Sequence, residues 1–213
     1  INDCFYMIST AHALIPMDNK PVFIAVGGGE PISLAGHQIR KNKEVDIAVM
    51  RISDQTVDKV FDECMFATSE CIQHTNYEKK DHMYEIVGYP SSKNYMKTRH
   101  HKISRSPLRV TSYDISDEFF PDKEYYKESH FAMKYDCNDI LDENFNKTQK
   151  RNMKGMSGCS ISEIFETESY ISAGIKGILI GSKNAKNALI GIRYDYIFEW
   201  VTDNAHEIPE PPR

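Results

Sequence analysis

The chain has 213 residues, of which 40% are apolar and 27% are charged, and its formal net charge is -5. A chain of this length and composition buries a sizeable core and fits one domain or two small subdomains packed together. The acidic balance argues against a general binder of nucleic acid or of membrane surfaces, and no apolar run approaches the roughly 18 residues of a membrane span.

Short β-branched or aromatic runs bounded by Gly, Pro, Asn and Asp dominate the chain, which is typical of an all-β protein. The expected strands are, in chain order, residues 4–9, 22–26, 47–52, 83–88, 108–113, 131–135, 170–180 and 188–192. Apolar residues at helical spacing predict one amphipathic helix from Tyr194 to about Asn204. The proline-rich tail, residues 207–213, is typical of a linker or a disordered end.

Two charged stretches adjoin in the middle of the chain. Residues 93–109 contain lysines, arginines and histidines with no acid, whereas residues 114–128 are mostly acidic. A partner-binding or regulatory surface is one interpretation. A solvated hairpin and loop is simpler, and we favour it.

The cysteines are odd in number. They are Cys4, Cys64, Cys71, Cys137 and Cys159. No secretory segment is visible, so we favour reduced thiols in the cytoplasm. The spacing of Cys64, Cys71 and His74 is not that of paired Cys-x-x-Cys ligands, so we expect no metal and no other cofactor.

Three residues occur in an order that suits nucleophilic catalysis. His12 follows an expected strand, Asp46 opens the apolar run 47–52, and Ser157 comes last. A serine hydroxyl becomes a nucleophile when an imidazole takes its proton, and a carboxylate then fixes the tautomer of the imidazole. Each residue is a weak signal alone, but the joint occurrence in the order His, Asp, Ser predicts a catalytic triad.

The serine lies in the motif Gly155-Met156-Ser157-Gly158. The two glycines permit a tight turn, which would point the backbone N–H groups of Gly155 and Ser157 at a developing oxyanion. Preorganised donors of this kind contribute a large part of the transition-state stabilisation in acyl transfer.

These motifs resemble those of trypsin-like serine peptidases with the chymotrypsin fold, and are closer to the intracellular bacterial members than to digestive enzymes. The matching segments are Thr10-Ala11-His12, Asp46-Ile47-Ala48-Val49, Val87-Gly88-Tyr89-Pro90, Gly155-Met156-Ser157-Gly158, Gly174-Ile175-Lys176-Gly177 and Gly191-Ile192-Arg193-Tyr194. The resemblance implies an all-β fold of two six-stranded β-barrels with a C-terminal α-helix. Residues 1–80 would supply His12 and Asp46, residues 81–193 would supply Ser157 and the specificity pocket, and residues 194–213 would form the helix and tail.

Two residues beside the serine depart from the family pattern. Met156 stands where digestive members carry the Asp that pairs with a newly cut N-terminus, so activation by N-terminal cleavage is not expected. Cys159 replaces the usual second glycine, which is tolerable if its side chain points away from the substrate. A cysteine nucleophile at Cys159 would be two residues out of register.

The resemblance also suggests a substrate pocket. Arg151 would lie at its base, with Gly177, Ile178, Leu179 and Gly191 as its walls. An arginine there would favour an acidic side chain before the scissile bond. We prefer the simpler interpretation that Arg151 belongs to an exposed basic cluster.

The implied function is that of a serine endopeptidase that cleaves polypeptides through an acyl-enzyme. Ile1 is not Met and a strand pattern follows at once, so we expect a leader, a strand or a domain upstream, as in the protease domain of a larger regulated bacterial protein. Stress response and antiviral defence are the roles suggested by analogy, with a regulatory domain or partner protein but no nucleic acid or membrane. Two alternatives are a protease-like binding module without catalysis and an enzyme that needs a partner to order its oxyanion loop.

Overall fold

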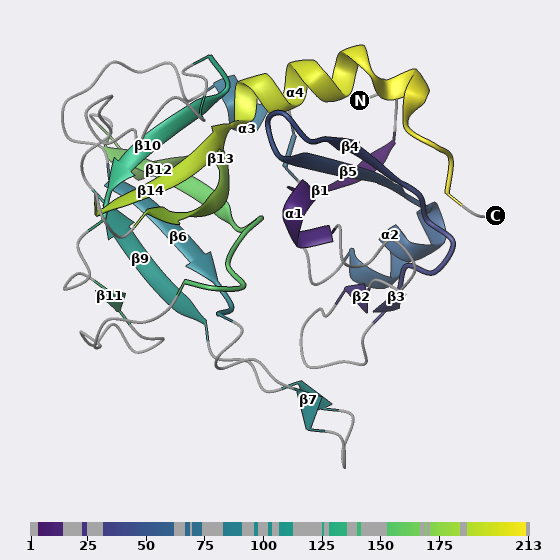
Figure 1. Cartoon of the computed structure of the whole chain (residues 1–213), viewed down its shortest axis with the longest axis horizontal. Coiled ribbons are helices and arrows are strands. Elements are labelled where there is room, and N and C mark those ends of the chain that lie inside the picture. Colours follow the sequence, from purple (N-terminus) through teal and green to yellow (C-terminus); the bar gives the residue numbers. More distant parts are fainter. Residues whose placement is uncertain are drawn as a thin grey trace.

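The computed structural model describes residues 4–14, 23–24, 32–61, 67–68, 70–73, 83–90, 96–97, 102–103, 107–112, 125, 128–135, 140–141, 153–166, 169, 171–183 and 187–211. Two antiparallel sheets, of three and seven strands, make up most of the regular secondary structure, and a helix lies near the C-terminus (Figure 1). The expected predominance of strands and the C-terminal helix are therefore confirmed. The two six-stranded barrels stay a prediction.

The three-stranded sheet is built around a strand that is buried on both faces. The strands are β1 (Phe5–Thr10), β5 (Ile47–Ile52) and β4 (Ile39–Asn42), in the spatial order β1-β5-β4. In β5, Ile47 and Val49 face one apolar cluster while Ala48 and Met50 face two others. The apolar run of this strand is unbroken because neither face meets water.

Short elements surround this sheet. Helix α1 (Ala11–Leu14) follows β1 directly, and α2 (Asp54–Val60) follows β5. Strand β2 (Phe23–Ile24) pairs with β3 (Ile32–Ser33). A further short helix, α3 (Glu70–Gln73), precedes the large sheet.

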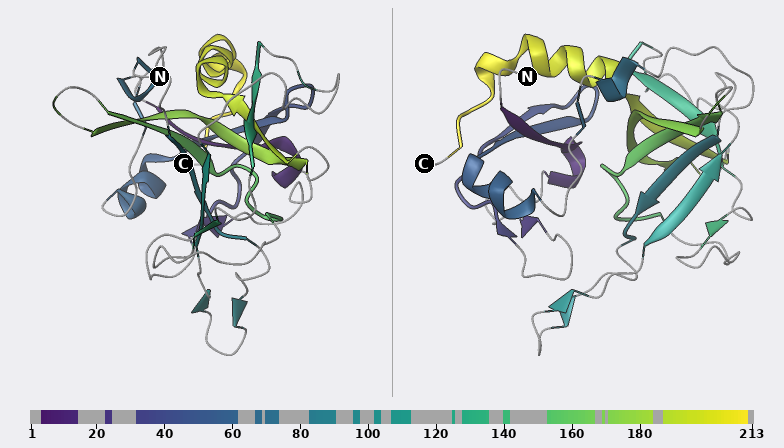
Figure 2. Two further views of the ribbon diagram at one scale, coloured as in Figure 1. Left: turned by 90° about the vertical axis from the view of Figure 1, so that its left-hand side faces the viewer. Right: turned by 180° about the vertical axis from the view of Figure 1, so that it is seen from behind.

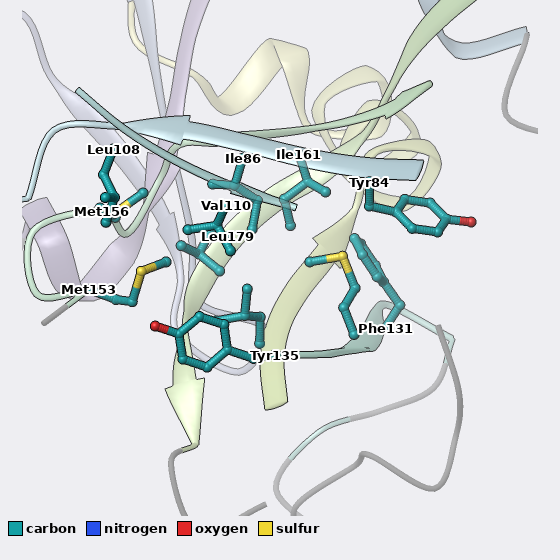
Figure 3. Close-up of a cluster of buried hydrophobic side chains, with 12 residues drawn as sticks. Tyr84, Ile86, Leu108, Val110, Phe131, Tyr135, Met153, Met156, Ile161 and Leu179 are labelled. Atoms are coloured by element: carbon teal, nitrogen blue, oxygen red, sulfur yellow. The ribbon is translucent and has the colours of Figure 1, made fainter. Parts of the chain in front are cut away.

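The seven-stranded sheet curls into a half-barrel (Figure 2). Its order is β10-β14-β13-β12-β6-β9-β11. The strands are β6 (Met83–Gly88), β9 (Leu108–Ser112), β10 (His130–Lys134), β11 (Ile140–Leu141), β12 (Ser160–Glu166), β13 (Ile171–Lys183) and β14 (Ala188–Arg193). Twelve buried side chains fill its concave side, and we call this cluster the half-barrel core (Figure 3). Its members are Tyr84, Ile86, Leu108, Val110, Phe131, Met133, Tyr135, Met153, Met156, Ile161, Leu179 and Leu189.

A second apolar cluster joins the two sheets, and we call it the inter-sheet cluster. Its buried members are Val45, Ile47, Val49, Ala132, Ile178, Ile180, Ala188, Ile190, Ile192, Ile197, Val201 and Ile208. They come from β5 and the turn before it, from β10, β13 and β14, and from the C-terminal helix α4 (Tyr194–Asp203) with the segment after it. Helix α4 runs across both sheets (Figures 1 and 2). Among the described residues, no helix has the length and apolar character to cross a membrane.

The tail is not a free linker over its described part, which corrects the expectation from its prolines. After the short helix η5 (Ala205–Glu207), Ile208 is buried in the inter-sheet cluster. Glu207 pairs with Arg40 of β4, and the Glu210 carboxylate lies 3.6 Å from the Arg51 guanidinium of β5. One buried apolar side chain and two ion pairs hold the segment on the three-stranded sheet.

Most expected strands are present, with small differences at their ends. Strands β5 and β6 have the predicted bounds, and α4 ends one residue early. Strands β4 and β12 were not predicted. Within the basic stretch 93–109, β7 (Met96–Lys97) pairs with β8 (Lys102–Ile103), which confirms a hairpin there. The acidic stretch lies largely outside the described residues.

We predict that Ile208→Ala destabilises the protein by about 2–5 kcal/mol, because truncating a fully packed isoleucine leaves a cavity as well as losing apolar burial. Urea unfolding followed by tryptophan fluorescence measures the change. Ile171→Ala is the matched control, since Ile171 is 75% exposed, and it should change stability by less than about 0.5 kcal/mol. Equal, small effects of the two substitutions would contradict the docking of the tail.

Candidate active site

A tight turn between β4 and β5 presents Asp46. The Asn42 side chain caps this turn, because its Oδ1 accepts from the backbone N–H groups of Glu44 (3.0 Å) and Val45 (3.4 Å). Asp46 has a φ of 62°, in the left-handed region that Asp and Asn tolerate better than most residues. Its carbonyl oxygen accepts from the Ala11 N–H at 2.9 Å, which ties the turn to the start of α1.

The Asp46 carboxylate holds His12 at two points. Oδ1 accepts from the backbone N–H of His12 at 2.8 Å, and Oδ2 lies 2.6 Å from the ring Nδ1. A carboxylate oxygen accepts hydrogen bonds, so the proton of the neutral ring is on Nδ1 and Nε2 carries the free lone pair. The backbone contact fixes the histidine's position, and the ring contact fixes its tautomer.

The free lone pair of His12 faces Ser157. The distance from Nε2 to the Ser157 Oγ is 2.9 Å, within reach for proton transfer. The same Oγ lies 2.8 Å from the carbonyl oxygen of Ile180 on β13. A hydroxyl has one proton to donate, so these two acceptors share it. The three residues predicted from the sequence are thus within hydrogen-bonding distance, although they are up to 145 positions apart in the chain.

Three backbone amides hold the shape of the serine loop, residues 153–159. The Met156 N–H donates to Met153 O (3.0 Å), Gly158 N–H to Leu179 O (2.7 Å) and Cys159 N–H to Met156 O (3.1 Å). Within the part of the chain that the structure describes, the amides of Gly155 and Ser157 donate to no protein group. These are the two amides predicted to stabilise an oxyanion.

Glycine is required at position 158 of this loop for two reasons. The backbone has a φ of 89°, where an L side chain is strained. A Cβ at this position would also lie 2.4 Å from the Ser9 Oγ on β1. The close approach of loop and strand brings the serine to the sheet that carries His12.

The two departures from the family pattern turn away from the site. Met156 is fully buried in the half-barrel core, and the Cys159 side chain packs against that core. Burial raises the pKa of the Cys159 thiol, although a hydrogen bond with the backbone of Tyr89 lowers it in part. A partly buried thiol with a raised pKa makes a poor nucleophile, which argues against catalysis by Cys159.

The predicted pocket walls lie in closely packed surroundings. Ile178 belongs to the inter-sheet cluster and Leu179 to the half-barrel core. Gly177 and Gly191 allow close packing, because a Cβ at Gly177 would lie 2.0 Å from Ile192 O and one at Gly191 would lie 2.7 Å from the Ile161 side chain. The substrate pocket therefore stays a prediction.

The residue of β13 that contacts the site is Ile180, which sequence reasoning missed. The pairing of β13 with β14 shifts register between Leu179 and Gly181, so Ile180 is an extra residue at this point. Bulges of this kind often lie beside active sites, where they redirect backbone groups. The predicted pocket base, Arg151, lies outside the described residues, as do Cys64 and His74.

The described residues contain no group of three or more His, Cys, Asp or Glu side chains arranged to hold a metal ion. No model of a known protein family matches the chain, and no curated protein matches it. The interpretation of the site therefore rests on its own geometry.

We predict that Cys159 reacts slowly with iodoacetamide in the folded protein. Burial raises the pKa of its thiol and blocks access, so at pH 7.5 alkylation should be at least about 10-fold slower than in urea. Mass spectrometry of the peptide that contains Cys159 measures the rate. Alkylation of folded and unfolded protein at the same rate would contradict the burial and would reopen the case for a cysteine nucleophile.

Proposed function

We propose that the protein is a serine endopeptidase of the two-barrel, trypsin-like type. The observation that carries this proposal is the chain of contacts Asp46 Oδ2 to His12 Nδ1 (2.6 Å) and His12 Nε2 to Ser157 Oγ (2.9 Å). A nucleophile, a base and a group that orients the base, each within hydrogen-bond reach of the next, are the recognisable pattern of covalent acyl transfer. The order of the three residues in the chain supports the trypsin-like type over other serine hydrolases.

Each contact has a role in the reaction. Ser157 Oγ attacks the peptide carbonyl carbon while His12 Nε2 takes its proton, and Asp46 stabilises the resulting imidazolium. The amides of Gly155 and Ser157 donate to the carbonyl oxygen as it becomes negative. Collapse of the intermediate breaks the C–N bond, and His12 gives its proton to the leaving amine. Water then hydrolyses the acyl-enzyme by the same route, which frees Ser157.

The edge of β13 supports a polypeptide substrate. Strand β12 pairs with β13 only as far as Ile178, and the serine loop bonds to Leu179. No described strand pairs with residues 180–183 on that side. Among the described residues, a Cβ at Gly181 would meet no atom within 4 Å. An extended peptide fits such an edge, since it can add to the sheet as a further strand beside Ser157.

Exposure of the base also supports catalysis. The His12 side chain is 50% exposed and Asp46 is 23% exposed, so the ring is accessible while its partner is shielded. The burial of Met156 and the packing of Cys159 weaken the case for a binding module that has lost catalysis, because neither side chain obstructs the site. We further propose a regulated bacterial context, in stress response or antiviral defence, by analogy alone.

The test is covalent labelling with a fluorophosphonate, which modifies activated serines. We predict labelling at Ser157 in the natural protein and none in Ser157→Ala. The labelling rate should fall by about 10³-fold or more in His12→Ala. In Asp46→Asn it should fall by about 10⁴-fold, which is the loss of turnover that the equivalent change causes in trypsin-like peptidases. His206→Ala is the matched histidine control, since the His206 side chain is 77% exposed, and its labelling should not change.

Cleavage of fluorescein-labelled casein, abolished by Ser157→Ala, distinguishes a peptidase from other serine hydrolases. A folded protein that neither labels nor cleaves would overturn the proposal in favour of a binding module. Labelling that appears only after a partner protein is added would identify a gated enzyme.

A further inference from the structure

Met156 is the one residue of the serine loop whose side chain is wholly enclosed by protein. It is 0% exposed, whereas Gly155 before it is exposed and Ser157 after it is partly exposed. It separates Gly155 and Ser157, whose amides donate to no protein group within the described part of the chain. A long apolar side chain between two exposed functional positions holds the loop against the core.

The side chain lies in a space that exists because residue 88 is a glycine. A Cβ at Gly88, the last residue of β6, would lie 2.8 Å from the Met156 Cε, 3.3 Å from its Cγ and 2.4 Å from the Cys159 Sγ. Figure 3 shows Met156 beside Leu108, with Met153 nearby, at one end of the half-barrel core. Gly88 and Leu108 are directly opposed in the pairing of β6 with β9. Gly88, Leu108 and Met153 thus lie around the Met156 side chain, and we call the space that it fills the Met156 seat.

The backbone of Met156 determines the direction of the Ser157 amide. The Met156 carbonyl oxygen accepts from the Cys159 N–H at 3.1 Å. That carbonyl and the Ser157 N–H belong to one planar trans peptide unit, in which the C=O and N–H bonds point in opposite directions. The bond to Cys159 therefore turns the Ser157 N–H away from the loop interior. It keeps this direction while Met156 stays in its seat.

We propose that Met156 is a positioning residue for the oxyanion site. Burial of its side chain over Gly88 holds the Ser157 amide in the orientation needed for transition-state stabilisation. Met156 touches no substrate and acts through the Ser157 amide. This inference rests on the proposed function, and it adds how the site is kept in its active form.

The test compares substitutions inside and outside the loop. Met156→Ala removes the side chain that fills the Met156 seat. Gly88→Ala adds a methyl group that narrows the seat from the side of β6. Met156→Leu conserves volume and apolar character. Met133→Ala is the matched control, because Met133 is also fully buried in the half-barrel core but lies on β10. The measurements are the second-order rate of fluorophosphonate labelling at Ser157, amide hydrogen exchange of residues 153–159, and the Tm.

Met156→Ala should slow labelling by about 10²-fold, as expected for loss of an oxyanion donor. Exchange of residues 153–159 should become faster in the same variant. Gly88→Ala should change both readouts in the same direction, while Met156→Leu should stay within about 5-fold of the natural protein. Met133→Ala should lower the Tm to an extent similar to Met156→Ala, with labelling and loop exchange unchanged.

The inference is overturned if Met156→Ala and Met133→Ala have equal effects on labelling and on loop exchange, since Met156 would then serve only stability. If Met156→Ala does not fold, Gly88→Ala decides on the same criteria. If the natural protein does not label, the proposed function fails, and hydrogen exchange alone decides the anchoring. Faster loop exchange in Met156→Ala than in Met133→Ala then supports it, and equal exchange refutes it.

Discussion

The inter-sheet cluster is the packing contact on which the site depends. His12 in α1 and Asp46 in the turn between β4 and β5 adjoin the strands of the three-stranded sheet, whereas Ser157 lies in a loop that leads into the seven-stranded sheet. The 2.9 Å contact between His12 and Ser157 therefore spans two separately hydrogen-bonded units. Apolar side chains from both sheets and from α4 are buried together in this cluster, and close-packed interiors permit little relative displacement. The precision of the polar site follows from the rigidity of the apolar contact behind it.

Two backbone turns orient the polar groups of the site on this packed framework. On one side, the capped turn and the left-handed Asp46 aim both carboxylate oxygens at a single histidine. On the other, Gly155 and Gly158 adopt positive φ angles, and the amides of Gly155 and Ser157 donate to no protein group among the described residues. The extra residue in β13 adds the Ile180 carbonyl as a second acceptor for the serine proton. The turn between β4 and β5 and the serine loop thus hold the polar groups of the site, and the two sheets hold these turns in place.

The sequence predicts those features that depend on residue type and order. The triad could be predicted because His, Asp and Ser carry the chemistry themselves, and β5 because an apolar run buried on both faces is distinctive. Strand β12 escaped prediction because its inward positions include the buried Glu163, whose carboxylate is bonded by the Tyr84 hydroxyl, so its pattern looks polar. The Ile180 contact escaped because a bulge depends on strand register, which no single residue reveals. Ile208 escaped because its neighbouring prolines are typical of a linker, while its own burial depends on distant residues.

The composition of the inter-sheet cluster has a consequence for the newly made chain. Three of its buried members, Ile197, Val201 and Ile208, lie near the C-terminal end of the sequence. During synthesis the nascent chain carries His12, Asp46 and Ser157 well before these residues leave the ribosome. Contacts between sequence-distant segments form late, because the long loop between them must first be closed. The three polar side chains therefore meet only after α4 and Ile208 have been synthesised, so a nascent chain that has not yet reached these residues exposes no assembled site to its neighbours on the polysome.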